Sequence, residues 1–182
     1  MNKLPFALLA AFMLVIVGSC SDDGYDMETY AEYQQANIEW YNEQANLKND
    51  DGTDFYTKLS PNWYPSSGVL IHYFNDRELT KNNLVPLSTS TVSVKYKGWI
   101  YTGAAFDSSY TEVDSIRTFT LNDGLIDGWK VALTNMHVGD SCRVIIPYAL
   151  GYGVNGSSAI PAFSTLAFDI KLVDIPAYEV RD

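Results

Sequence analysis

The stretch FTLNDGLIDGWKVALTNMHVGDSCRVIIP, residues 119–147, contains the change of pattern that decides the fold. Its middle carries apolar residues at i, i+3, i+4 and i+7, the spacing of one face of a short helix: Trp129, Ala132, Leu133 and Met136. Gly139 follows closely and is expected to end the helix. Beyond it, Cys142 alternates with Val144 and Ile146, which is typical of a half-buried strand. The stretch therefore predicts one helix leading into a strand.

Short β-rich segments lie on both sides of this stretch. Strands are predicted at residues 69–74, 91–98, 115–121, 140–147 and 164–175. Most of them alternate apolar and polar residues, as strands do when one face of a sheet packs on a core. The predicted fold class is α+β, a twisted antiparallel sheet with one short helix laid on one face.

Four runs of this region resemble the FKBP family of peptidyl-prolyl cis-trans isomerases, in the same order and at consistent spacing. They are VSVKYKGWIYTGAAFDSS (residues 92–109), the quoted run 119–147, LGYG (150–153) and AIPAFSTLAFDIKLVDI (159–175). The resemblance extends over residues 66–176, and only a short tail, 177–182, follows. It implies an FKBP-like half-barrel of strands wrapped around the helix, with an apolar pocket between them.

The resemblance also implies a site in this pocket. Matched by position, Trp129 forms the floor, Asp107 and Tyr152 make polar contacts, and the backbone N–H of Ile126 binds a substrate carbonyl. The implied wall residues are Tyr96, Phe106, Leu125, Ile126, Ile160 and Phe168. Without the resemblance, plain core would be the favoured interpretation of the aromatic residues, and Asp107 could be a turn residue. The implied partners are proline-containing polypeptides and macrolide ligands, and no cofactor or metal is expected.

This sequence departs from the family pattern in three places. Arg117 stands where many members carry an aromatic wall residue, so one side of the pocket is expected to be more open or polar. Residues 154–159 form a shorter segment than usual, with Ser157 or Ser158 in the region of a common histidine, and Leu125 replaces the commoner valine. Two hypotheses follow: an active isomerase that assists the folding of exported proteins, or a catalytically weak module that binds a proline-containing partner.

Other chemistries find little support. His72 and His137 lie in a predicted strand and in the turn after the helix, with no triad spacing and no zinc-ligand pattern. The glycine-rich residues 150–156 lack the GK[ST] of a phosphate loop. NDDGTD (49–54) resembles a calcium loop but places Leu47 at the first ligand position, so a solvated turn is expected. The formal net charge of −10 argues against nucleic acid and against electrostatic docking on anionic lipid.

The first twenty residues predict export and lipid attachment. Residues 4–17 carry no charge and are too short to span a bilayer comfortably. VGSC (17–20) resembles a bacterial lipobox, which predicts a signal peptide over residues 1–19 and acyl chains, palmitate among them, on Cys20. We expect a lipoprotein of the Gram-negative cell envelope, in the outer membrane; acidic residues 21–23 resemble surface-export signals. The alternative is an ordinary secreted protein.

Residues 20–65 are predicted to form an acidic tether with one helix, and residues 49–67 a loop. The helix carries an apolar stripe: Met27, Tyr30, Ala31, Ile38, Tyr41 and Ala45. It would pack on the domain or space it from a membrane. Because it is short for a dimerising arm, we expect a monomer. Cys142 has no disulfide partner if Cys20 is acylated, so we expect a buried apolar residue rather than a reactive thiol.

Overall fold

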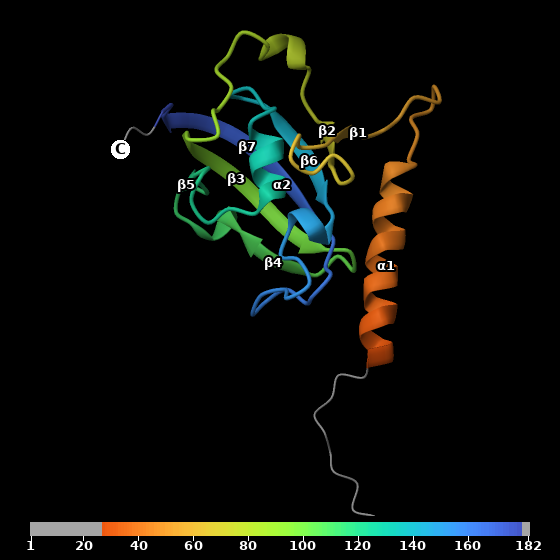
Figure 1. Ribbon diagram of the computed structural model, residues 1–182. Coiled ribbons are helices and arrows are strands. Elements are labelled where there is room, and N and C mark those ends of the chain that lie inside the picture. Colours follow the sequence, from red (N-terminus) through yellow and green to blue (C-terminus); the bar gives the residue numbers. More distant parts are fainter. Residues whose placement is uncertain (1–26, 180–182) are drawn as a thin grey trace, which may run out of the picture.

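A computed structural model describes residues 27–179, so the predicted signal peptide and Cys20 lie outside the described residues. Three single 3₁₀ turns accompany the helices and strands, at Arg77–Leu79, Ser109–Thr111 and Tyr148–Leu150. The helices and strands, shown in Figure 1, are α1 Met27–Ala45, β1 Thr57–Leu59, β2 Val69–Tyr73, β3 Thr91–Ile100, β4 Ala105–Ser108, β5 Arg117–Thr120, α2 Asp127–Leu133, β6 Ser141–Ile146 and β7 Leu166–Ala177.

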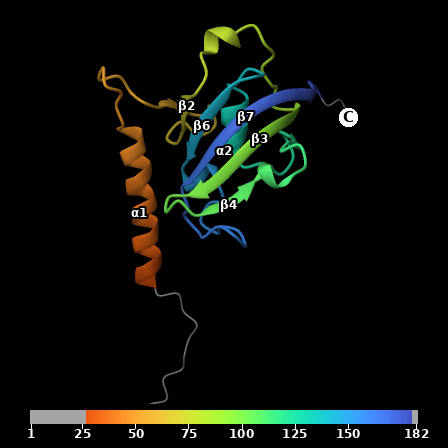
Figure 2. The same ribbon diagram turned by 180° about the vertical axis from the view of Figure 1, so that it is seen from behind.

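The seven strands of the described region form one antiparallel sheet, in the order β1-β2-β6-β7-β3-β4, with β5 also paired to β3. The long strands β3 and β7 are its centre, paired from Ile100 opposite Leu166 to Thr91 opposite Ala177. The open sheet twists around α2, which covers one of its faces (Figure 1 and Figure 2). The predicted α+β class, an antiparallel sheet wrapped around one short helix, is confirmed.

The main core fills the space between α2 and the sheet. The predicted stripe of α2 is buried there, and it packs on sheet residues such as Val94, Val144 and Leu172. The helix ends earlier than predicted, at Leu133. Met136 follows in a turn, and its backbone N–H donates to the Leu133 carbonyl. Gly139 has a φ of +97°, a conformation that glycine adopts without strain.

Cys142 lies inside this core. Its side chain is fully buried, and its sulfur is 3.5 Å from the sulfur of Met136. Burial raises the pKa of the Cys142 thiol because an apolar environment disfavours the thiolate. The side chain therefore behaves as the predicted apolar core residue.

The helix α1 packs on the opposite face of the sheet from α2. Trp40, Tyr41 and Ala45 contact a second cluster of buried residues that includes Leu70 and Ile145. The Tyr41 hydroxyl also donates to the Gly68 carbonyl over 2.7 Å. The helix is therefore part of the domain and not a free spacer.

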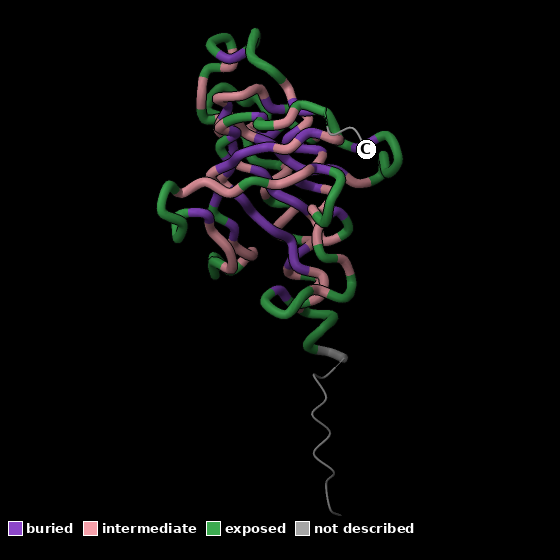
Figure 3. The backbone as a smooth tube through the Cα atoms, turned by 90° about the vertical axis from the view of Figure 1, so that its left-hand side faces the viewer, coloured by how far each residue is buried: buried purple, intermediate pink, exposed green. Residues whose placement is uncertain are grey.

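The predicted apolar stripe of α1 is only partly right. Tyr41 and Ala45 face the domain as expected, but Tyr30 and Ala31 are exposed. Residues 29–32 of α1 are exposed, in contrast to the buried strands (Figure 3). The helix instead turns Tyr33 and Asn37 towards the domain through hydrogen bonds, which an apolar pattern cannot reveal.

Two short strands were not predicted. Residues 57–59, expected to be loop, pair with β2, and residues 105–108 pair with β3. Both lie at edges of the sheet and are too short to show alternation. Between residues 27 and 179, no helix is long and apolar enough to span a bilayer.

Candidate active site

A hollow of about 350 Å³ opens where β3, β4, β5 and β7 meet the start of α2. Its lining combines aromatic side chains with a few polar groups at the rim. It consists of Tyr96, Phe106, Asp107, Phe119, Asp123, Gly124, Leu125, Ile126, Trp129, Tyr152 and Phe168. Eight of the nine residues assigned to the site from the sequence are therefore brought together around one hollow.

Trp129 lies at the bottom of this hollow and is 3% exposed. Its ring meets three others nearly edge to face, with centroid distances of 4.9 Å to Tyr96, 5.2 Å to Phe168 and 5.5 Å to Phe119. Such arrangements are favourable because the positive edge of one ring faces the negative face of another. We call these four rings the aromatic box. Its mutual packing gives the hollow a fixed apolar floor.

Gly98 makes room for the box. It lies on β3 opposite Phe168 of β7. A Cβ atom at this position would lie 2.5 Å from Cε1 of Phe168 and 3.0 Å from Cζ of Phe106. These two rings stand perpendicular to each other at 5.5 Å. Only glycine lets the Phe168 ring lie this close to the β3 backbone.

Three side chains form a polar cluster at one side of the hollow. The Tyr96 hydroxyl donates to Asp107 Oδ2 over 2.5 Å, and Arg117 Nη1 donates to the Tyr96 oxygen at 2.7 Å and to Asp107 Oδ1 at 3.0 Å. Arg117 also pairs with Glu112 at 3.2 Å. Burial, together with the hydrogen bond to Asp107, raises the pKa of Tyr96. At neutral pH the tyrosine therefore stays protonated and holds the Asp107 carboxylate in place.

Arg117 is not among the residues that line the hollow, although it belongs to the polar cluster at one side of it. Its guanidinium is directed to Asp107 and Glu112, and the aromatic wall is supplied by Phe119, two residues further along β5. Phe119 is not among the site residues that the resemblance implies. The signal was available, because residues two apart on a strand face the same side of a sheet.

Two hydrogen-bond donors lie at the rim. They are the Tyr152 hydroxyl and the backbone N–H of Ile126, the residue that precedes α2. Within residues 27–179 neither has a hydrogen-bond acceptor among the contacts of the folded chain. Burial and the nearby Asp107 carboxylate raise the pKa of Tyr152, so its hydroxyl keeps its proton at neutral pH. The hollow can therefore receive carbonyl oxygens at its rim.

Ile160 is the one assigned residue that is not among those lining this hollow. It is 3% exposed and belongs to the main core, and it borders a second hollow between residues 155–162 and α1. The turn that carries it is closed by Ser157 N–H donating to the Ile160 carbonyl at 2.7 Å. Because Ile160 shares this core with Trp129 and Phe168, its role in the wall of the first hollow stays a prediction. No group of three metal-ligating side chains occurs within residues 27–179.

Comparison with known proteins identifies the family. Residues 85–173 match the family model of the FKBP-type peptidyl-prolyl cis-trans isomerases. FK506-binding protein 2 of Debaryomyces hansenii is 41% identical over 92 residues, which are 50% of this chain and 67% of that protein. The chain belongs to the FKBP-type isomerase family. Every residue that lines the first hollow falls within the matched range.

Two further peptidyl-prolyl cis-trans isomerases show how the chain compares in length and fold. FkpA of Escherichia coli is 42% identical over 90 residues, half of this chain, and the chain spans only 33% of its length. The crystal structure of a Pseudomonas syringae peptidyl-prolyl cis-trans isomerase superposes with a TM-score of 0.66 at 27% identity, over 84% of this chain and 98% of that one. The helix α1 precedes the part that matches the family model.

Proposed function

We propose that the chain is a peptidyl-prolyl cis-trans isomerase that acts on proline-containing segments of polypeptides in the hollow above Trp129. One observation carries the proposal: a fixed aromatic floor lies below a rim that offers two hydrogen-bond donors, the Tyr152 hydroxyl and the Ile126 N–H. A proline ring fits the apolar floor, and the carbonyls that flank it fit the donors.

The reaction needs no nucleophile. The barrier to rotation of a peptide bond is about 18–20 kcal/mol because amide resonance is lost in the twisted state. Isomerisation of an X-Pro bond therefore takes tens to hundreds of seconds without a catalyst. The twisted amide carries less charge on its carbonyl than the planar one. An aromatic, water-poor floor then disfavours the planar state more, which is differential binding of the transition state.

The polar cluster supports this assignment. Asp107 lines the hollow beside the aromatic box, and Tyr96 and Arg117 hold both of its oxygens. The carboxylate is thus fixed and charge-compensated, which suits orientation of a substrate more than proton transfer.

The test is a proline-peptide isomerisation assay on the full chain purified in detergent. We expect acceleration over buffer, with a large loss in Trp129→Leu. A folded wild-type chain without acceleration would contradict the isomerase proposal. Binding of proline peptides without acceleration would instead favour the alternative, a catalytically weak module that binds a proline-containing partner.

We further propose that the chain acts outside the cytoplasm as a monomer that assists the folding of exported proteins, held to the outer membrane through lipid on Cys20. The lipobox-like VGSC sequence and the uncharged run before it support this. Membrane fractionation and mass spectrometry of the N-terminus test the anchor. Wild type is expected in the membrane fraction and Cys20→Ala in the soluble fraction of the envelope; equal distribution of the two would contradict the anchor. Gel filtration with light scattering tests the monomer.

A further inference from the structure

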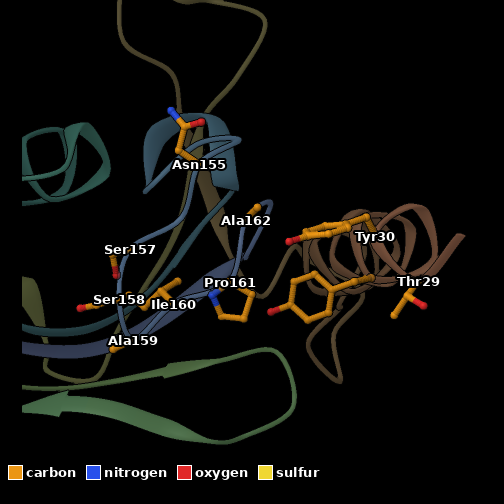
Figure 4. A pocket seen from close by; sticks show the side chains of 10 residues that line it. Thr29, Tyr30, Asn155, Ser157, Ser158, Ala159, Ile160, Pro161 and Ala162 are labelled. Atoms are coloured by element: carbon orange, nitrogen blue, oxygen red, sulfur yellow. The ribbon is translucent and has the colours of Figure 1, made fainter. Parts of the chain in front are cut away.

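The loop of residues 151–165 lies between the proposed isomerase hollow and α1. Its first part carries Tyr152 at the rim of that hollow, and residues 155–162 border the second hollow, of about 440 Å³. Figure 4 shows Tyr30 on α1 facing Pro161 and Ala162 of the loop across this space. In the middle of the loop Ile160 is buried in the main core, and near β7 the end of the loop is held by contacts to α1.

Asn37 of α1 makes the first of these contacts. Its side chain is fully buried, and its Oδ1 accepts the backbone N–H of Thr165 at 2.6 Å. The Thr165 hydroxyl donates to the Asn37 carbonyl at 3.1 Å, and Asn37 Nδ2 donates to the Tyr33 carbonyl at 2.8 Å. A buried amide with both ends satisfied fixes its partner closely, because any shift leaves a polar group unpaired.

Tyr33 makes the second contact, one helical turn earlier. Its hydroxyl lies 2.8 Å from Ser164 Oγ, and Ser164 Oγ donates to the Pro161 carbonyl at 2.7 Å. A serine hydroxyl has one proton, so the Tyr33 hydroxyl is the donor to Ser164. The chain of bonds from Tyr33 through Ser164 to Pro161 ties the loop to α1.

Backbone hydrogen bonds within the loop connect the end held by α1 to the residues at the isomerase hollow. Phe163 N–H donates to the Gly153 carbonyl at 3.0 Å, and Gly156 N–H donates to the Tyr152 carbonyl at 3.1 Å. The end of the loop that α1 holds is therefore bonded directly to the residues around Tyr152.

We propose that Tyr33 and Asn37 are positioning residues of the isomerase site, which set the place of Tyr152 through the 151–165 loop. This rests on the proposed function and extends it, because α1 lies outside the part of the chain that matches the family model. In this proposal α1 helps to position a residue of the isomerase site.

The test compares Tyr33→Phe with Tyr41→Phe in the full chain in detergent. Both changes remove one hydroxyl from α1, but Tyr41 donates to Gly68, away from the loop. We expect kcat/KM to fall about fivefold in Tyr33→Phe, the factor of one ordinary hydrogen bond, and to stay at the wild-type value in Tyr41→Phe. Thermal unfolding of both variants shows whether their losses of stability are equal.

A second measurement separates positioning from a general structural role. If Tyr33 acts through Tyr152, Tyr152→Phe should cost less activity in the Tyr33→Phe background than in wild type, whereas independent effects would add. Amide hydrogen exchange at Gly156 and Phe163 should be faster in Tyr33→Phe only. Unchanged kcat/KM in Tyr33→Phe, or additive losses, would overturn the positioning role while leaving the isomerase proposal intact. An inactive wild-type chain would overturn the isomerase proposal itself.

Discussion

The change Gly98→Ala adds one methyl group where β3 passes Phe168. The new Cβ would lie 2.5 Å from Cε1 and 2.8 Å from Cδ1 of the Phe168 ring. Non-bonded carbon atoms rest at about 3.5–4.0 Å, so the ring must retreat by roughly 1 Å. Trp129 and Phe106 hold it on other sides, at centroid distances of 5.2 Å and 5.5 Å. The displacement therefore reaches the floor of the hollow.

Over-packing of this kind costs about 1–3 kcal/mol of the free energy of unfolding. Because a misplacement of 1 Å can cost up to about 100-fold in rate, we expect kcat/KM to fall by about tenfold or more. Urea unfolding and the proline-peptide assay measure the two effects. Gly68→Ala is the matched control, since its Cβ would lie 2.7 Å from Ser60 Oγ at the β1–β2 edge, away from the site. Wild-type stability and activity in Gly98→Ala would refute this account of the aromatic box.

Three further changes test other parts of the molecule. Trp129→Leu should lower kcat/KM by more than about tenfold, measured well below its unfolding temperature, because the floor is lost; near-normal activity would count against the floor. Arg117→Leu should lower kcat/KM about fivefold, because the carboxylate of the polar cluster loses a charged donor, and an unchanged value would assign Arg117 to stability alone. Asp140→Asn should cost about 1–3 kcal/mol at pH 7, because the side chain is buried among its hydrogen-bond donors.

The last of these changes has a defined pH dependence. Burial acts to raise the pKa of Asp140, but hydrogen bonds from Thr80, the His137 N–H and Asn75 outweigh it and lower the pKa. A lowered folded-state pKa means that the ionised carboxylate contributes stability above the unfolded value of about 4, and that this contribution is lost as the pH falls through the folded value. The difference between wild type and Asp140→Asn in urea unfolding should therefore narrow below about pH 4. A difference that stays constant from pH 7 to pH 3 would show that ionisation of Asp140 does not matter.

The positions of α2 and of the long strands can be predicted from the sequence, because these elements bury apolar residues that recur at regular spacing. The stripe from Trp129 to Met136 and the alternation on β7 follow directly from this physics. The short edge strands β1 and β4 carry no such pattern. Their pairing is decided by neighbours that lie far away in the sequence.

The residues of the site were predicted from a family resemblance, so the prediction is good only at positions where this sequence follows the family pattern. The resemblance fixes eight positions that line the hollow, but it says little about a loop whose length differs, and Ile160 lies on that loop. Arg117 forms an ion pair with Asp107, a residue ten positions away on another strand. This contact could not be predicted from the sequence alone. The contacts of Tyr33 and Asn37 join residues more than 120 positions apart, so no local pattern could reveal them.

The central claim is that one aromatic hollow above Trp129 catalyses isomerisation of X-Pro bonds. The most direct measurement is the isomerisation rate of a proline peptide by the full chain, titrated with a macrolide that binds FKBP-type sites. We predict acceleration over buffer that falls to the uncatalysed rate as the macrolide saturates the chain. A folded chain that leaves the uncatalysed rate unchanged, or an acceleration that survives saturation by the macrolide, would contradict the claim.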